Sequence, residues 1–436
     1  AIFIVRQLQE KYLAAGKPLY MAFVDLEKAF DRVPRRVIWW AMRKLRCEEW
    51  LVGLVQCMYV NARSRVRVGV GCSGEFEVKV GVHQGSCLSP LLFIIVLEAL
   101  SQEFRSGCPW EGLYADDLVI IAESLEDMQE KLELWKSGME AKGLRVNMGK
   151  TKVLISGTGL DVLKKSGKDP CAVCLTGTGA NSIGCSGCNR WVHKKCSGIS
   201  GSLKPDPEFK CKRCRGEARP IDGRPMTEVA VGSESVDVVA SFCYLGDNLS
   251  AGGGSELATI TRCGIAWKKF HQLLPILTAR YLSPATRGRV FNTCVRSAML
   301  HASETWVRPV AELNRLRRND RAMIRWMCGV STEDDVSSDS LLVKMGLDDI
   351  ETLLRKRRLR WAGHVERSTA WIKRVGDIVV ADEGRGRGRP KKTWGDAVRE
   401  DREALGLLQV NPSDRLVWRG RLRSSVKQDP PLFTRD

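Results

Sequence analysis

The chain has 436 residues, of which 69 are Lys or Arg and 51 are Asp or Glu, so its formal net charge is +18 at pH 7. This length exceeds the usual size of one domain, and about two to four modules are expected. The positive charge predicts a polyanionic partner, although a soluble surface alone would also explain it. No apolar run approaches the roughly 18 residues of a membrane span, which excludes a membrane protein of the helical kind.

Residue spacing predicts a helix followed by a strand at the start of the chain. The sequence opens on Ala1 rather than Met and carries no secretory signal, so we expect an internal or truncated piece of a soluble intracellular protein. Apolar residues at helical spacing predict a helix over residues 1–15. A strand-like apolar run then ends on Asp25.

The next segment alternates apolar and polar residues between Val66 and Val82, with Gly at the turns. This pattern is typical of a β-hairpin. After His83-Gln84-Gly85, the pair Ser89-Pro90 begins an apolar helix that runs to Leu100, with Pro near its first turn as expected. We interpret His83 as a structural neighbour rather than a general base, because nothing near it in the sequence suggests a partner.

Two adjacent carboxylates, Asp116 and Asp117, precede a short apolar run that predicts a buried strand over residues 118–122. Unpaired buried charges are costly, and a divalent cation would offset that cost. If this strand lies beside the one that ends on Asp25, Asp25 meets Asp116, and three carboxylates converge as in a two-metal phosphoryl-transfer site. A solvated Asp-Asp turn is the alternative.

Four segments then carry a family resemblance. Between the last two, an amphipathic helix is predicted over residues 127–142. The sequences of the four segments are DLEKAFD, HQGSCLSPLLF, YADD and GLRVNMGKTKVL. In order and spacing they are similar to the motifs of a reverse transcriptase palm, and the chain resembles non-LTR (LINE-type) retrotransposon reverse transcriptases of animals.

The resemblance implies an α+β fold with a right-hand polymerase palm whose fingers are truncated. It also implies an RNA-directed DNA polymerase that uses an RNA template, a DNA primer, deoxynucleoside triphosphates and two Mg²⁺ or Mn²⁺ ions. The metal ligands would be Asp25, Asp116 and Asp117. The implied nucleotide-binding residues are the Leu26 carbonyl beside the metal, Phe30 under the sugar, Gln84 and Gly85 at the incoming nucleotide, and Lys150 near the triphosphate. A core role for Phe30 and a solvated surface role for Lys150 remain open.

Beyond a Gly-, Ser- and Lys-rich linker, seven Cys and one His recur in pairs with two residues between the members of each pair. This spacing suits two tetrahedral zinc sites, and a reducing compartment disfavours disulfides. The segment resembles a PHD-type finger with a cross-brace, which implies two interleaved ligand sets. The first set is Cys171, Cys174, His193 and Cys196, and the second is Cys185, Cys188, Cys211 and Cys214.

Trp191 matches a position where histone-reading fingers place one wall of a methyl-lysine cage. Pro170 and Ser182 stand where better readers carry aromatic walls, so at least half of that cage is missing. Several lysines lie nearby, and a nucleic-acid contact is therefore as plausible as a histone tail.

The remainder of the chain predicts helices. By resemblance, residues 218–310 form a thumb-like region, and residues 311–436 form a basic region with Arg beside Trp326 and Trp361. Arg with interleaved aromatics suits RNA or single-strand binding, although a basic helix face with Trp in a local core explains the pattern equally well. Residues 385–392, RGRGRPKK, resemble an AT-hook for A·T-rich DNA, and a flexible basic linker is the alternative.

The predicted division is thus a palm at 1–157, a linker at 158–168, a finger at 169–217, a thumb at 218–310 and a basic region at 311–436. The sequence leaves two functions open. One is the polymerase of a non-LTR retrotransposon, in a truncated copy, and the other is a catalytically inactive zinc-dependent nucleic-acid or chromatin-binding protein. As a ribonucleoprotein the polymerase would occur in cytoplasm and nucleus and act in the nucleus.

Overall fold

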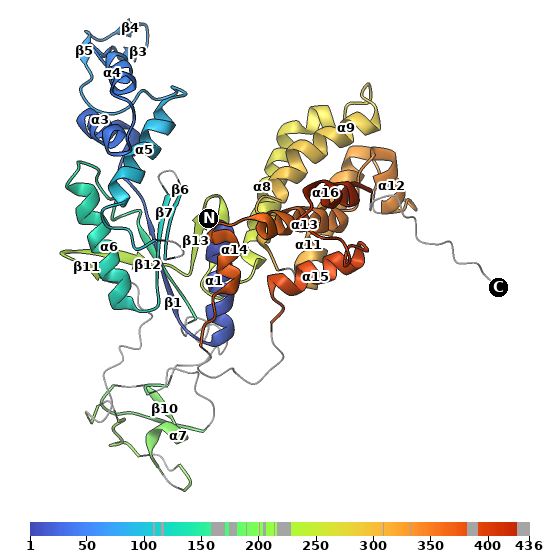
Figure 1. Ribbon diagram of the computed structural model, residues 1–436. Helices are drawn as coiled ribbons and strands as arrows, with labels where there is room; N and C mark the ends of the chain where they lie inside the picture. Colours follow the sequence, from blue (N-terminus) through green and yellow to red (C-terminus); the bar gives the residue numbers. More distant parts are fainter. Residues whose placement is uncertain are drawn as a thin grey trace. The chain divides into compact units, whose positions relative to one another are not determined.

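The computed structural model forms two compact units, here called the sheet unit, Lys17–Ala240, and the helical unit, Ala1–Gly16 with Ser241–Asp436 (Figure 1). The mixed α and β architecture confirms the predicted fold class at this level. The structure describes residues 1–107, 110–114, 117–157, 171–173, 181–188, 190–199, 201–203, 206–212, 214–215, 228–307, 309–331, 333–381 and 391–424.

A six-stranded sheet in the order β11-β12-β8-β1-β7-β6 dominates the sheet unit. Neighbouring strands are antiparallel except β12 and β8, which are parallel. The predicted strands before Asp25 and after Asp117 are both confirmed, and they are direct neighbours. The strands are β1 (Leu19–Val24), β6 (Glu111–Tyr114), β7 (Asp117–Ala122), β8 (Lys152–Ser156), β11 (Glu228–Val231) and β12 (Glu234–Val238).

The helices of the sheet unit share one apolar core with this sheet. The predicted amphipathic helix is confirmed as α6, and its apolar residues at helical spacing are buried. Trp135 of α6 is 1% exposed and donates from Nε1 to Glu111 Oε1 at 3.0 Å. The helices are α2 (Ala29–Arg32), α3 (Arg35–Lys44), α4 (Glu49–Cys57), α5 (Ser89–Ser101) and α6 (Leu125–Glu140).

The predicted β-hairpin is present as four very short strands that begin slightly earlier than expected. β2 (Arg63–Ser64) pairs with β5 (Phe76–Glu77), and β3 (Arg67–Val68) pairs with β4 (Gly71–Cys72). All the residues of these strands are exposed, since the alternating valines have no sheet to pack on.

The finger segment contributes β9 (Ser182–Gly184), β10 (Trp191–His193) and α7 (Lys194–Ser197). In chain order it lies between β8 and β11, which are strands of one sheet. This differs from the predicted division, which ended the palm at residue 157 and assigned residues 218–310 to a helical thumb. Val229 and Val231 alternate with exposed residues along β11 and pack in the sheet core, which is the two-residue period of a half-buried strand.

The helical unit also departs from the predicted division, because the helix over residues 2–15 groups with it. The other predicted helices are confirmed, including those around Trp326 and Trp361. Its elements are α1 (Ile2–Ala15), β13 (Ser241–Tyr244), β14 (Asp247–Ser250), α8 (Glu256–Leu277), α9 (Pro284–Val290), η1 (Phe291–Arg296), α10 (Ser297–Met299), η2 (Ser303–Thr305), α11 (Val310–Cys328), α12 (Ser338–Met345), α13 (Ile350–Arg367), α14 (Trp371–Arg374), η3 (Val375–Asp377), α15 (Trp394–Ala404) and α16 (Arg415–Ser424).

Buried ion pairs tie the elements of the helical unit together. Arg6 of α1 pairs with Asp247 at 2.7 Å, and Arg296 pairs with Asp320 at 2.6 Å. Breaking one such pair would leave an uncompensated buried charge, which makes these contacts specific for one arrangement of helices. Among the described residues, no helix is both long and apolar enough to cross a membrane.

Candidate active site and metal centre

The ends of β1 and β7 bring two of the predicted carboxylates together. Val24 is paired with Leu118, so continuing the antiparallel register by one residue sets Asp25 level with Asp117. Residues at the same level of an antiparallel pair project from the same face, with Cβ atoms about 5 Å apart. The continued register thus brings Asp117 to Asp25, and the expectation that Asp25 meets Asp116 stays a prediction. Asp116 lies outside the described residues.

Both carboxylates are accessible to solvent. Asp117 is exposed, and the side chain of Asp25 is 44% exposed. Below them the strands are buried on both faces, since Val24 and Leu118 on one face and Phe23 and Val119 on the other are almost fully covered. The apolar sheet thus supports two carboxylates at its surface, where a polar substrate can reach them.

The turn that precedes β8 is tied to the end of β1. The Asn147 N–H donates to the Asp25 carbonyl at 2.8 Å, and the Asp25 N–H donates to Thr151 Oγ1 at 3.3 Å. Lys150 Nζ lies 3.9 Å from Asp25 Oδ2, and this lysine side chain is 73% exposed. Leu26 forms an isolated bridge with Val146 of the same segment. Lys150 therefore lies beside Asp25 and is accessible, and its expected place near the triphosphate stays a prediction.

Two hydrogen bonds, one between backbone groups and one between side chains, join the segments that carry Phe30 and Gln84. The Val82 N–H donates to the Phe30 carbonyl at 2.9 Å, and Gln84 Nε2 donates to Asp31 Oδ1 at 2.7 Å. The half-buried Phe30 ring stacks on Phe93 with centroids 4.9 Å apart. Both residues expected at the nucleotide thus occupy one neighbourhood, on helix α2 and on the segment before α5.

Glycines shape this segment, and one of them was missed in the sequence. Gly85 has φ of +82° with open space around it, so its requirement is conformational. At Gly81, φ is +79° and an added Cβ would lie 2.7 Å from the Asp31 carbonyl oxygen. Helix α2 therefore approaches this segment closely at Gly81, and the expected place of Gly85 at the incoming nucleotide stays a prediction. The Gly81-Val82 pair directly before His83 was the only sequence signal for this close approach.

His83 stacks on Tyr59 with ring centroids 4.5 Å apart and an interplanar angle of 16°. This contact explains its position as a packing neighbour, as predicted. The Arg35 guanidinium lies over the other partner of this stack, 4.9 Å from the Tyr59 centroid.

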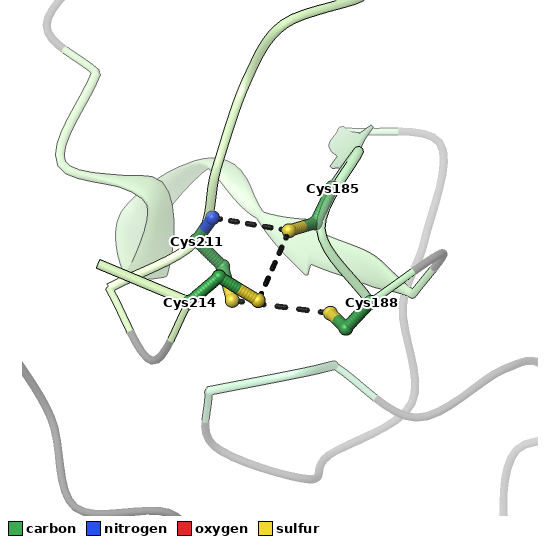
Figure 2. A group of neighbouring side chains, drawn as sticks. All are labelled: Cys185, Cys188, Cys211 and Cys214. Carbon is green, nitrogen blue, oxygen red and sulfur yellow. Dashed lines mark hydrogen bonds between the residues drawn. The ribbon is translucent and has the colours of Figure 1, made fainter. Parts of the chain in front are cut away.

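In the finger, Cys185, Cys188, Cys211 and Cys214 converge on one point (Figure 2). The Sγ atoms of Cys185 and Cys214 are 3.7 Å apart. Those of Cys188 and Cys211 are 4.0 Å apart. A tetrahedral zinc ion with Zn–S bonds of about 2.3 Å sets its sulfurs about 3.8 Å apart, whereas a disulfide requires about 2.05 Å. The four thiols therefore fit a zinc ion and do not fit disulfides.

The thiols of this group differ in acidity. Burial raises the pKa of Cys185, but backbone N–H groups, that of Cys211 first, outweigh burial and lower this pKa to about 6. Burial and the neighbouring thiols raise the pKa of Cys214 to about 12. Four crowded sulfurs cannot all ionise together unless a cation neutralises them, which is the electrostatic reason why such a group suits zinc.

Cys171, His193 and Cys196 form a second group, and Cys196 Sγ lies 4.0 Å from His193 Nδ1. The N–H groups of Val173 and His193 each donate to Cys171 Sγ at 3.4 Å, which fixes the position of this sulfur. Cys174 lies outside the described residues. The two groups have the interleaved composition that the PHD resemblance implies.

Trp191 of β10 is 46% exposed, and its partner across the two-stranded sheet is Gly184. Ser182 is level with His193. The face beside Trp191 thus has no second aromatic wall among the described residues, in agreement with the sequence. Pro170 lies outside them.

Comparison with known proteins agrees with this geometry. Residues 4–189 match the family model described as reverse transcriptase (RNA-dependent DNA polymerase), and residues 171–214 match that of the PHD-finger. The chain is related to the reverse transcriptases of non-LTR retrotransposons and carries a PHD finger. The family resemblance drawn from the four motifs is thereby confirmed.

Individual relatives come from mobile elements. The chain is 33% identical over 138 residues to the Pol polyprotein of the type-1 retrotransposable element R2 of Nasonia vitripennis, covering 30% of this chain and 14% of that protein. It is 26% identical over 168 residues to the 149 kDa protein of transposon TX1 of Xenopus laevis, covering 36% and 13%. The chain thus spans about one seventh of these relatives.

Among solved structures, telomerase of Candida albicans in complex with a fragment of telomeric RNA aligns with 87% of this chain and 54% of its own. The alignment has 10% identity and a TM-score of 0.34.

Proposed function

We propose that the chain is the polymerase core of a non-LTR retrotransposon protein, which adds deoxynucleotides to a primer 3′-hydroxyl along an RNA template. The observation that carries this proposal is the level pairing of Asp25 with Asp117 on neighbouring strands, within the part of the chain that matches the reverse transcriptase model. The match supports the reaction type, and the carboxylate pair supports the position of the site.

The residues present fit a divalent cation. Carboxylate oxygens together with substrate phosphates are the ligands that Mg²⁺ prefers. Asp25, Asp117 and, by the resemblance, Asp116 would hold two ions, which in such sites activate the attacking hydroxyl and stabilise charge on the leaving pyrophosphate. Both described carboxylates are accessible, so a triphosphate can complete the coordination.

Other side chains would orient the nucleotide. Lys150 is exposed beside Asp25, and it can place its ammonium group against the triphosphate while it remains within reach of the carboxylate. Phe30 is fixed by its stack on Phe93, and a fixed ring can select against a 2′-hydroxyl by contact with the sugar. Gln84, held by Asp31 and preceded by the rigid turn at Gly81, would contact the incoming nucleotide.

The PHD finger would bind two zinc ions and add a contact to nucleic acid. With one exposed aromatic wall, Trp191, and the exposed Lys210 on the same module, phosphate contacts suit it as well as a histone tail does. We place the activity in the nucleus, in a ribonucleoprotein.

Primer extension on an RNA template tests the proposal. Because the chain spans about one seventh of its R2 relative, the assay uses the zinc-loaded chain both alone and joined to the upstream region of that relative. Mg²⁺-dependent addition of deoxynucleotides, abolished when EDTA removes Mg²⁺, is the expected result for the joined protein.

A joined protein that binds the primer–template and adds no nucleotide would contradict the polymerase proposal. It would favour the second function, a catalytically inactive zinc-dependent nucleic-acid-binding protein, to which the net charge of +18 and the eight paired ligands also point.

A further inference from the structure

Three aromatic rings gather on the surface of the helical unit, outside the candidate active site and the finger. Trp267 and His271 lie one turn apart on α8, and Trp326 lies on α11. The His271 ring centroid is 5.7 Å from that of Trp267 and 5.5 Å from that of Trp326. The two tryptophan rings are 6.3 Å apart. We call these three residues the aromatic platform.

The platform is open to solvent although it borders a complete core. Trp326 is 48% exposed and His271 is exposed, while Phe270 directly behind them is fully buried. Each exposed aromatic ring leaves apolar area in water at a cost of roughly 25 cal/mol per Å². An exposed tryptophan beside a buried core therefore favours a ligand that covers it.

The rings are held in place before any ligand arrives. Trp267 Nε1 donates to Asn319 Oδ1 at 2.7 Å, and Asn319 Nδ2 donates to the Arg315 carbonyl at 2.8 Å. Phe270 contacts Trp326 edge to face, with centroids 5.8 Å apart. Fixed aromatic side chains lose little conformational entropy on binding.

Cations outnumber exposed carboxylates on these two helices, because both carboxylates of α11 are buried and α8 has only Glu256, eleven residues before Trp267. The sequence from residue 257 to residue 283 contains no Asp or Glu, whereas it contains Lys268 and Lys269, both exposed. On α11, Glu312 and Asp320 are buried and bonded to Ser255 and Arg296.

Two basic residues of α11, unlike its carboxylates, are exposed. Arg318 and Arg321 are exposed, and Arg321 has one distant partner, Asp339 at 4.0 Å. The helices that carry the rings thus have exposed cations, while the carboxylates of α11 are buried. The complementary ligand is an anion.

We infer that the aromatic platform binds unpaired bases of a single-stranded nucleic acid. The ligand must combine negative charge with flat apolar faces, and a nucleic-acid strand whose bases are unpaired has both. In a duplex the base faces are stacked and hidden, and an acidic peptide has charge without rings. The inference rests on the proposed function, since it names where a nucleic-acid strand is held outside the polymerase site.

The test compares binding of a fluorescent oligothymidylate with binding of a duplex of the same length, using the full zinc-loaded chain. Trp326→Ala is expected to weaken single-strand binding about tenfold, the usual effect of losing one stacking ring, and to change duplex binding much less. Its salt dependence should equal that of the wild type, because no charge is removed.

Matched variants separate stacking from folding. Trp371 is an exposed tryptophan elsewhere in the helical unit, with Arg374 5.5 Å from its ring, so Trp371→Ala should leave single-strand affinity unchanged. Trp326→Phe should restore most of the affinity, and His271→Ala should weaken it without a change in the thermal midpoint.

Three results would overturn the inference, and the first can be told apart from the other two. Wild-type protein that binds neither strand would remove the proposed function as well. If Trp326→Ala and His271→Ala bind the single strand with the affinity of the wild type, the platform alone is overturned. The same conclusion follows if these variants lose equal affinity for the single strand and for the duplex.

Discussion

The carboxylates of the candidate active site extend from a sheet with a large apolar core, whereas the thiols of the finger surround a space with few apolar side chains. The sheet core joins strands and helices from residue 22 to residue 236. In the finger core, three of the seven buried residues are themselves candidate ligands: Cys171, Cys185 and Cys211. A sheet can thus position metal ligands before metal arrives, while the finger needs metal to hold its ligands together.

Removing zinc should show this difference between the finger and the sheet most clearly. Chelation is expected to unfold residues 171–215, since structural zinc contributes about 10 kcal/mol or more to such modules, and to leave β1 and β7 protected. Hydrogen exchange read by segment checks this. Cys185→Ser should act similarly, whereas Cys243→Ser, an exposed cysteine outside both groups, should not.

Elemental analysis tests how many zinc ions the finger binds. We expect about two zinc ions per reduced chain, from two closed four-ligand sites. Less than one zinc per chain, or unchanged exchange across the finger after chelation, would contradict the metal dependence.

A substitution in the apolar core of the six-stranded sheet should destabilise the sheet and leave the finger unchanged. Trp135→Ala removes a fully buried ring that bonds to Glu111 and contacts Phe104, and about 3–5 kcal/mol of unfolding free energy should be lost. Zinc content should stay the same. Leu134→Ala, one residue away and 48% exposed, is the control, with an expected change within about 0.5 kcal/mol. A loss of zinc in Trp135→Ala would show that the two regions do not fold independently.

A smaller effect is expected at the glycines beside Gln84. Gly81→Ala combines positive φ with a backbone contact at 2.7 Å and should cost about 2–3 kcal/mol. Gly85→Ala has open space and should cost about 1 kcal/mol. Denaturant unfolding of the two variants distinguishes them, and equal losses would show that close approach at Gly81 has no role.

Sequence spacing predicted the local elements well and their grouping less well. The core residues of α6 follow from periodicity, because burial on one face leaves a regular pattern, and the strands beside Asp25 and Asp117 follow from short continuous apolar runs. The ligand sets of the finger follow from resemblance. The joining of β11 and β12 to the sheet could not be predicted, since the alternation of Val229 and Val231 fixes a strand without fixing its neighbour.

The geometry of the candidate active site also could not be predicted from the sequence, because it depends on strand register. The sequence shows two adjacent carboxylates. Which of them lies nearest Asp25 depends on the register of β1 and β7, in which Val24 is paired with Leu118. The position of the aromatic platform depends on the packing of α8 against α11, which brings together residues about sixty apart in sequence. Such long-range contacts leave no local signal.

The most direct test of the central claim, that Asp25 and Asp117 form the reaction centre of a preformed sheet site, is primer extension by Asp117→Asn in the protein joined to the upstream region of its relative. The variant keeps the shape of the side chain and removes one negative charge, so the extension rate should fall by orders of magnitude while thermal stability and zinc content stay constant. Asp127→Asn removes an exposed carboxylate on α6 that pairs with Lys131, and it should extend normally. Extension by Asp117→Asn at the rate of Asp127→Asn would contradict the claim.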